Sequence, residues 1–184
     1  LSICGCGTPS SGYRVSGYDP KKTESVLILP FLDVASFQDE KDPLGKDKVE
    51  HVRQLFIETI RENPFFARKT IIAPAFERSG YSTTLAEAIE YGKKFNADLV
   101  VAGQCFSFVT TRAASIPPRA GLFIRIFSVP EKRLVFAGED YRAAGAPGAT
   151  GGRDFQAKLA AQTIVNDYLD DAKNSLRTSV VDTN

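Results

Sequence analysis

The sequence predicts an α/β fold of the α+β kind, a sandwich in which a mixed β-sheet packs against about three helices in the order β-α-β-α-β-β-β-α. Three observations predict it. Two apolar runs are each followed by a segment with helical spacing, as in buried strands joined by helices. A later pair of β-prone runs surrounds a short polar turn, which predicts a hairpin. The last periodic segment is again helical.

The first strand and the first helix follow one another along the chain. SVLILPFLDV (25–34) is a continuous β-prone apolar run and predicts a strand that is buried on both faces. Apolar side chains then recur at intervals of three and four, and Asn63-Pro64 ends the helix. The apolar stripe consists of Val49, Val52, Phe56 and Ile60, with Lys48, Glu50, Arg53 and Glu58 outside it.

The second strand and helix repeat this arrangement. TIIAPAFE (70–77) predicts the strand, and Thr84 with Glu87 fits a capping box at the start of the next helix. Asn96 fits a left-handed residue at the end of that helix. Its apolar stripe is Leu85, Ala88, Ile89 and Phe95.

The C-terminal half predicts three strands and a helix. ADLVVAGQCFSFVTT (97–111) is followed by LFIRIFSV and RLVFAGEDYRA, which pair around the turn Pro130-Glu131-Lys132. Asp154 is a candidate cap for the last helix. We expect one globular domain over 25–177 and a disordered tail over 178–184.

Composition excludes several classes of protein. The formal net charge is +1, from 23 basic and 22 acidic residues, so electrostatics give no reason to expect nucleic acid as a partner. No apolar stretch approaches the roughly 20 residues of a membrane-spanning helix. We expect any membrane contact to be made through an end of the chain.

The cysteines near the start of the sequence favour a lipid anchor. The chain has three Cys and one His, which are too few suitably placed ligands for a structural zinc site. Cys4 and Cys6 are too close in the sequence to form an unstrained disulfide. A branched aliphatic residue, Ile3, stands three positions before Cys6, and the small Gly5 directly precedes it. This pattern resembles a bacterial lipobox.

The lipobox resemblance implies cleavage before Cys6 and acylation of its sulfur, with residues 1–5 as the remainder of a signal peptide. Gly7, in place of an aspartate, is compatible with sorting to the outer membrane. Cys4 is a rival acceptor, and an unmodified flexible start is the alternative. Residues 6–24 read as a flexible linker, whose 18 residues beyond Cys6 reach at most about 60 Å.

The order of the elements, the segment FNADLVVAGQCFSF and the hairpin LFIRIFSVPEKRLVFAGE resemble a group of bacterial envelope proteins. The group contains the curli-secretion lipoprotein, the outer-membrane lipoprotein activators of penicillin-binding proteins, a flagellar outer-membrane lipoprotein and the N-terminal domain of the Tol-system propeller protein. The resemblance covers about residues 25–176. It implies a periplasmic domain without catalytic activity that binds other envelope proteins and forms homo-oligomers, in many cases rings.

The sequence differs from members of this group in two ways that disfavour particular functions. The connections TTRAASIPPRAG and AAGAPGATGG lack the alternating pattern of barrel-forming hairpins, so we do not expect a pore. A short linker disfavours the role of peptidoglycan-synthase activator, which stays open as the alternative. The leading hypothesis is an assembly component of a flagellar or secretion-associated ring.

No sequence motif indicates catalysis, a metal or a cofactor. His51 is expected on the polar side of the first helix, and GAPGATGGRD lacks the lysine of a phosphate-binding loop. Asp98 is expected to orient a strand end and Cys105 to be a buried small hydrophobe. The acidic loop residues Asp39, Glu40 and Asp42 are interpreted as solvated charges.

Candidate partner contacts come from two segments. Aromatic side chains in the linker, Tyr13 and Tyr18, could dock into a neighbouring subunit or simply be solvated. Pro117, Pro118 and Arg119 form a stiff basic loop that fits either a partner contact or a rigid turn.

Overall fold

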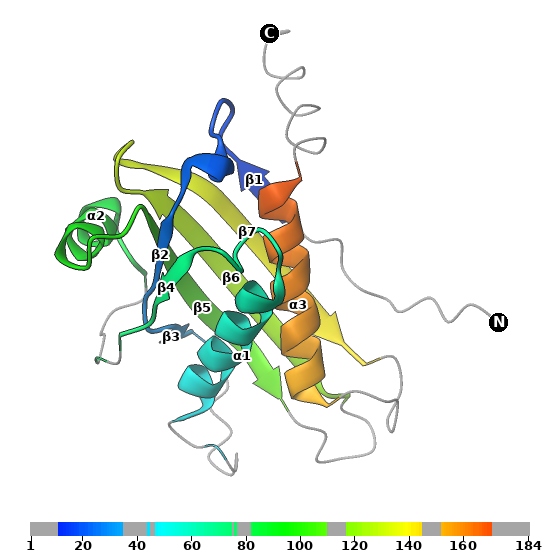
Figure 1. Ribbon diagram of the computed structural model, residues 1–184. Coiled ribbons are helices and arrows are strands. Elements are labelled where there is room, and N and C mark those ends of the chain that lie inside the picture. The colour runs from blue at the N-terminus through cyan, green and yellow to red at the C-terminus, as the bar shows by residue number, and fades with distance from the viewer. Residues whose placement is uncertain are drawn as a thin grey trace, which may run out of the picture.

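The chain folds as a mixed β-sheet with three α-helices, as the sequence predicted. The computed structural model describes residues 11–34, 44, 47–74, 76, 82–109, 117–144 and 152–170. Figure 1 shows α1 and α3 side by side over one face of the sheet, with α2 near the β2 and β4 end. The elements are β1 Ser11–Arg14, the 3-10 helix η1 Pro20–Lys22, β2 Ser25–Ile28, β3 Leu32–Asp33, α1 Lys48–Glu62, β4 Thr70–Ile72, α2 Leu85–Lys94, β5 Leu99–Val109, β6 Arg119–Ser128, β7 Arg133–Ala143 and α3 Arg153–Leu169.

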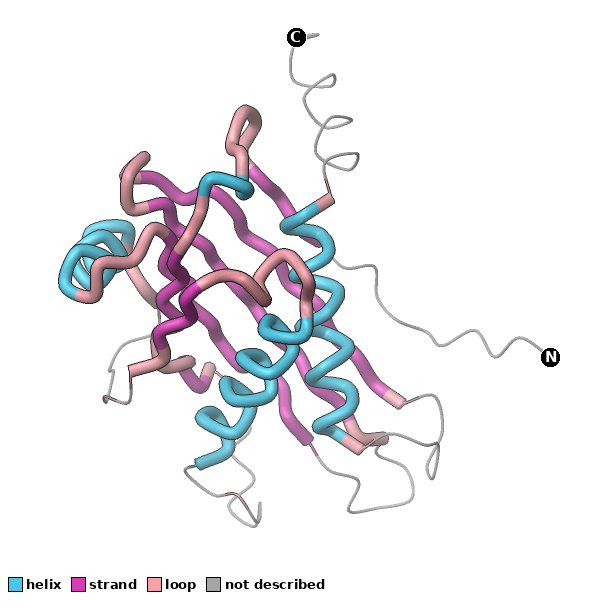
Figure 2. Tube along the Cα trace, viewed as in Figure 1, coloured by secondary structure: helices cyan, strands magenta, loops and turns pink. Residues whose placement is uncertain are grey.

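The sheet has the strand order β1-β7-β6-β5-β2-β4, and β3 also pairs with β5. β2 is parallel to both β4 and β5, whereas β5, β6, β7 and β1 follow one another in antiparallel pairs. Figure 2 shows β5, β6 and β7 as long adjacent strands. The predicted hairpin is therefore the centre of the sheet.

The first predicted strand is divided in two. β2 ends at Ile28, and Pro30 follows within two residues, where its ring cannot donate to a strand ladder. The ring of Phe31 then packs over Gly103, where an added Cβ would come within 2.3 Å of it, before β3 resumes pairing with β5. The second predicted strand is also shorter than expected, with β4 covering only Thr70–Ile72.

The helix ends match the sequence in most places. Thr84 and Glu87 form the predicted capping box, and Asn96 has the predicted positive φ, 50°. The prediction for Asp154 is wrong, because Gly152 is the N-cap of α3 and no side chain caps it. Asp154 instead places its Oδ2 3.0 Å from His51 Nε2 on α1.

Two apolar clusters hold the layers together. The larger lies between the sheet and the helices α1 and α3, and it includes Phe56, Ile124, Phe136 and Tyr168. The smaller lies on the other face of the sheet, where Ala88 of α2 packs near Val100 and Phe127. Each face of the sheet therefore carries a core, but the two cores differ greatly in extent.

The prediction of a flexible linker is wrong for residues 11–24. β1 pairs with β7, and Tyr18 is buried, with its hydroxyl 3.2 Å from Thr23 Oγ1. The physical reason is that β7 offers an edge to which any short segment can add through its backbone. Residues 11–24 therefore belong to the fold. The lipidation residue Cys6 and the predicted tail 178–184 lie outside the described residues.

Candidate functional site

The face of the sheet opposite α1 and α3 is covered by α2 over only part of its area. Along β6, Leu122, Ile124 and Ile126 belong to the core under α1 and α3, so the alternate residues point to the other side. Within the described residues, the core under α2 extends no further along β6 than Phe127. We call the remainder the open face, and it comprises Tyr13 of β1, Phe106 of β5, Phe123 and Arg125 of β6, and Glu139 and Tyr141 of β7.

Stacked aromatic rings form one end of the open face. The rings of Phe106 and Tyr141 are 6.5 Å apart between centroids and inclined by 17°. Gly121 lies beneath, and a Cβ at that position would approach Phe106 Cε2 to 2.3 Å. A β-bulge between Cys105 and Ser107 leaves Phe106 on this side. The glycine therefore allows an aromatic ring from β5 to lie across β6 towards β7.

Arginine and further aromatic side chains form the other end. The guanidinium of Arg125 lies 5.8 Å from the ring centroids of both Phe123 and Phe127. Tyr13 is 52% exposed, which is large for an aromatic residue, and Glu139 is exposed on the neighbouring strand β7. Tyrosine, phenylalanine and arginine are the residue types enriched at protein interfaces. The open face therefore has the composition of a protein-binding surface.

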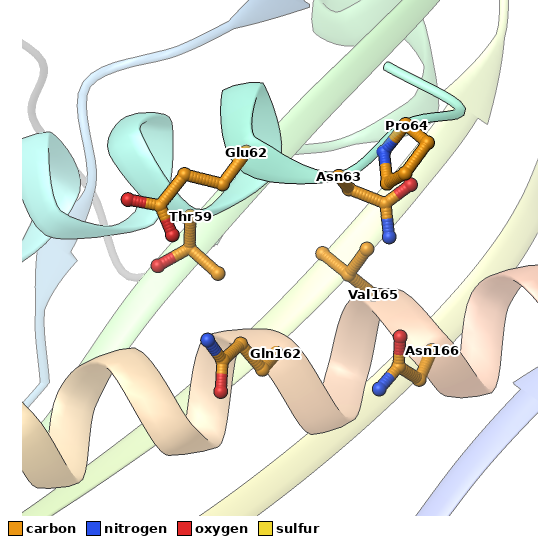
Figure 3. Close-up of a pocket in the computed structure, with 7 residues that line it drawn as sticks. All are labelled: Thr59, Glu62, Asn63, Pro64, Gln162, Val165 and Asn166. Carbon is orange, nitrogen blue, oxygen red and sulfur yellow. The ribbon is translucent and has the colours of Figure 1, made fainter. Parts of the chain in front are cut away.

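A groove lies on the opposite side of the molecule, between α1 and α3. Its volume is about 350 Å³, at the lower end of the range for small-molecule pockets. Figure 3 shows the carboxylate side chain of Glu62 on α1 and the amide side chains of Gln162 and Asn166 on α3 around it. Such groups can donate and accept hydrogen bonds around an inserted polar or aromatic side chain. The groove is lined by Thr59, Glu62, Asn63, Pro64, Gln162, Val165 and Asn166.

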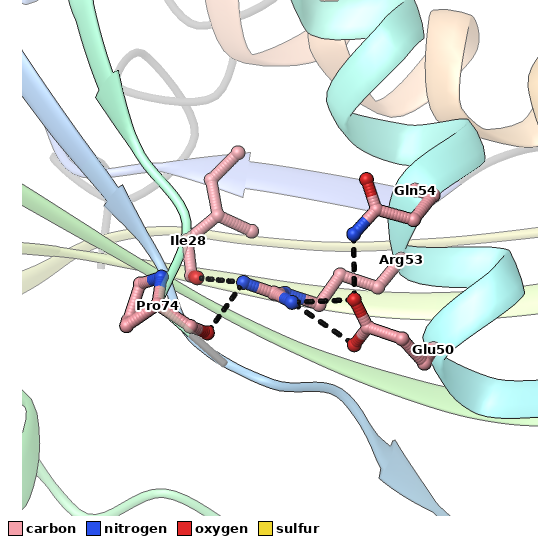
Figure 4. A network of polar contacts seen from close by, with 5 residues as sticks. All are labelled: Ile28, Glu50, Arg53, Gln54 and Pro74. Atoms are coloured by element: carbon pink, nitrogen blue, oxygen red, sulfur yellow. Dashed lines mark hydrogen bonds and ion pairs between the residues drawn. The ribbon is translucent and has the colours of Figure 1, made fainter. Parts of the chain in front are cut away.

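A buried arginine on α1 fixes that helix to the sheet (Figure 4). The Nη2 atom of Arg53 donates to the carbonyl oxygens of Ile28, at 3.1 Å, and Pro74, at 2.9 Å. Its Nη1 donates to both carboxylate oxygens of Glu50, at 2.7 and 2.9 Å. Arg53 is only 1% exposed, so it is buried although it stands outside the apolar stripe predicted for this helix. Its role is to satisfy carbonyl groups where β2 and β4 end.

The predicted partner residues are placed differently from one another. Tyr13 lies exposed on the open face, but Tyr18 is buried and contacts Thr23 and Tyr168 of its own chain, so it is not free to dock elsewhere. Pro118 is buried and its carbonyl accepts from the Ala144 N–H, while Pro117 is half-buried. Arg119, the first residue of β6, pairs with Ala143 of β7, whereas Tyr13 pairs with Ala137. Arg119 and Tyr13 are therefore six residues apart along β7 and do not form one contact surface.

The open face could not be identified from sequence periodicity alone. Phe106 and Phe123 read as ordinary members of apolar strands, because nothing in a strand pattern says that a helix will cover only part of one face. The bulge before Ser107 also breaks the alternation of β5, since Cys105 and Phe108, three residues apart, both lie in the core under α1 and α3. One signal was available: the alternation of Ile124 and Ile126 with Arg125 predicts a hairpin with one face more exposed than the other.

The remaining candidates for chemistry have structural explanations. Burial raises the pKa of the Cys105 thiol to about 12, which makes it unreactive. The carboxylate of Asp98 accepts from the backbone N–H groups of Glu24 and Ser25, both at 2.9 Å, and so orients the start of β2 as predicted. In the part of the chain that is described, no three His, Cys, Asp or Glu side chains could share a metal ion.

Two predicted loops fall outside the described residues. They are the acidic segment with Asp39, Glu40 and Asp42, and the loop over 145–151. Of the helices in the described ranges, none combines the length and apolar character needed to span a bilayer.

Comparison with known proteins defines the class of fold. No protein-family model and no curated protein matches the sequence. A solved structure with a similar fold is the PelC dodecamer from Paraburkholderia phytofirmans, with a TM-score of 0.62 and 15% identity over 87% of this chain and 97% of that one. At this identity the likeness establishes a shared fold and nothing more.

Two weaker likenesses concern other bacterial proteins. Lipoprotein GNA1162 from Neisseria meningitidis has a TM-score of 0.45 and 14% identity over 80% of this chain and 98% of that one. The LpoB C-terminal domain from Escherichia coli has a TM-score of 0.41 and 13% identity over 68% of this chain and 87% of that one. Scores this low carry no argument about the present chain.

Proposed function

We propose that this chain is a non-catalytic lipoprotein of the bacterial envelope that assembles with copies of itself and with other envelope proteins. The observation that carries the proposal is the open face, on which stacked aromatic rings and a guanidinium group are presented by rigid strands. Surfaces of this composition bind other proteins.

Self-association is supported by the similarity to a protein that forms a dodecamer. A shared fold does not by itself transfer an oligomeric state. In this chain, however, an exposed Phe155 on the helical side accompanies the exposed Tyr13 on the open face. Exposed aromatic residues on two opposite sides fit a subunit that contacts one neighbour on each side.

The proposed anchor is acylated Cys6 in the outer membrane, with the domain on the periplasmic face. Because β1 begins at Ser11, only four residues, 7–10, separate the fold from that cysteine, a span of at most about 18 Å. This is much less than the reach of the 18-residue linker that the sequence predicted. A partner close to the outer membrane is therefore favoured over a distant synthase, and a flagellar or secretion-associated ring is the finer proposal.

Two measurements test the proposal. Mass photometry of the purified full chain is expected to give discrete oligomers whose population grows with concentration, and a strictly monomeric protein at high micromolar concentration would remove the self-assembly. Mass spectrometry of the protein from its native host is expected to find a diacylated or triacylated Cys6 as the first residue. An intact Leu1 there would remove the anchor.

A further inference from the structure

The outer surface of α3 carries a row of exposed side chains that point away from the sheet. Phe155, Gln162 and Asn166 are spaced at seven and four residues, which places them on one side of the helix. All three are exposed, and Phe155 is 50% exposed. Gln162 and Asn166 also line the α1–α3 groove, so the row leads from Phe155 into that groove.

α3 runs antiparallel to β7 along nearly the same length of the molecule. At the start of α3, the guanidinium of Arg153 lies 4.5 Å from the ring centroid of Phe108 on β5. Phe108 pairs with Ala120 of β6, which in turn pairs with Arg142 of β7, so the helix begins beside Arg142. Near its end, the ring of Tyr168 lies edge-on to Phe136 with centroids 5.5 Å apart. The helix rises about 22 Å between Arg153 and Tyr168, and β7 rises about 20 Å between Phe136 and Arg142.

Because α3 and β7 lie alongside each other, each residue of α3 can be matched to the residue of β7 at the same height, which we call its level. Phe155 falls at the level of Tyr141, which belongs to the aromatic stack on the open face. The groove residues Gln162 and Asn166 fall around the level of Ala137, with which both Tyr13 and Arg125 are in register. The open face and the helical side therefore carry matching features at two equal levels, on opposite sides of the sheet.

We propose that the open face of one copy packs against the outer surface of α3 and α1 in the next copy. Phe155 of the second copy then lies on the Phe106 and Tyr141 rings of the first. Tyr13 of the first copy enters the α1–α3 groove of the second. This inference rests on the proposed self-assembly and specifies the interface that carries it.

One pair of opposite charges stands at the same level of the two surfaces. Arg125 stands at the level of the groove, and the groove contains the exposed carboxylate of Glu62. The contact joins two different surfaces, so repetition of it gives a closed ring or an open filament. Copies that are anchored in one membrane have the same orientation relative to the membrane normal. Residues at equal levels of neighbouring copies therefore face each other around a ring.

Disulfide cross-linking tests the register directly. In the full chain with Cys4 and Cys6 replaced by serine, Tyr13→Cys combined with Gln162→Cys is expected to give a ladder of covalent oligomers on mild oxidation. The two positions lie on opposite sides of one sheet, so they cannot join within a chain. Mixing the two single variants is expected to stop at dimers of one variant with the other, since each copy then has one reactive end.

The outcomes separate this interface from the assembly itself. Oligomers in mass photometry without a Tyr13–Gln162 ladder would overturn the interface and leave the self-assembly intact. A dominant Tyr13–Tyr13 dimer would also overturn it, because that product requires two identical surfaces in contact. A monomer at every concentration would remove the proposed function as well.

A matched pair of substitutions tests the Phe155 contact. Phe155→Ser is expected to weaken association by about tenfold or more, as for a central aromatic contact. Leu85→Ser is the control, because Leu85 is 42% exposed on α2 and lies outside the proposed interface. Both variants are expected to fold, since both side chains are exposed. Equal association of the two variants would contradict the contact.

Discussion

Arg14 of β1 donates from Nη1 to the backbone carbonyl of Tyr168, near the end of α3, at 2.7 Å. The two residues are 154 positions apart in the chain, and the bond is buried. It occupies one of the carbonyl groups that the last turn of a helix leaves without a partner in the helix. The N-terminal strand is thereby joined both to the edge of the sheet and to the last helix.

Arg14→Ala is expected to reduce the free energy of unfolding by about 1–3 kcal/mol, because a buried carbonyl loses a charged donor. Urea denaturation measures this. Arg61→Ala is the matched control, since Arg61 is exposed on α1 and its loss should change stability little. Equal stability of the two variants would mean that β1 adds little to the fold.

Asp140 is expected to destabilise the protein at neutral pH. Burial raises the pKa of this carboxyl, Asp167 raises it further, and the bond from Arg142 Nε, at 2.5 Å, lowers it only in part. The folded state therefore binds a proton more readily than the unfolded state. Stability should fall as the pH rises from about 4, the unfolded pKa, through the folded pKa, and the loss persists above it.

Asp140→Asn removes this titration and keeps an oxygen for Arg142. The variant is expected to be more stable than the wild type at pH 7 and to lose the decline that begins near pH 4. Urea midpoints over a pH series measure both effects, with Asp47→Asn, an exposed residue, as the control. An unchanged pH profile in Asp140→Asn would contradict the raised pKa.

Two glycines under phenylalanine rings should respond differently to the same substitution. A Cβ at Gly103 would come within 2.3 Å of the Phe31 ring in the core, and a Cβ at Gly121 would come equally close to Phe106 on the open face. Gly103→Ala is expected to cost about 1–3 kcal/mol of stability through overpacking. Gly121→Ala should cost less, because the half-buried Phe106 can move outward.

The same pair of variants is informative about association. Gly121→Ala displaces the ring that stacks on Tyr141, so it should weaken self-association measured by mass photometry. Gly103→Ala should leave association unchanged in whatever fraction remains folded. If Gly121→Ala lowers stability as much as Gly103→Ala, Phe106 is held more tightly than its exposure indicates.

Local patterns in the sequence were sufficient for the elements whose signal is local. The capping box of Thr84 with Glu87 and the left-handed Asn96 were both predicted, since each depends on residues within one helical turn. The long central strands were predicted because each contains a β-prone apolar run, LVV in β5, LFIRIF in β6 and LVF in β7. These features determine the fold class.

Features that depend on distant backbone groups could not be predicted. SGYR of β1 carries no apolar run, and its pairing with β7 uses main-chain groups that every residue possesses. Arg53 is buried because the carbonyls of Ile28 and Pro74 meet beside α1, which no spacing along the chain reveals. The open face depends on the extent of α2 and on a bulge, so it too required the three-dimensional arrangement.

Asp98 should stabilise the fold in a pH-dependent way. Burial raises the pKa of this carboxyl, but the bonds from the N–H groups of Glu24 and Ser25 and from the Ser25 hydroxyl more than offset this, so the pKa lies below its usual value. A lowered folded pKa means that the stabilisation is present above the unfolded pKa, about 4. It is lost as the pH falls through the folded pKa.

Asp98→Ala is therefore expected to lose about 1–3 kcal/mol at pH 7, because two backbone N–H groups lose their charged acceptor. The difference from the wild type should shrink as the pH falls below about 4, where the wild-type carboxyl becomes protonated. Glu131→Ala, which removes an exposed carboxylate from the β6–β7 turn, is the control. A constant difference at all pH values would mean that Asp98 acts through packing, because only the ionised carboxylate accepts these bonds with the charge that strengthens them.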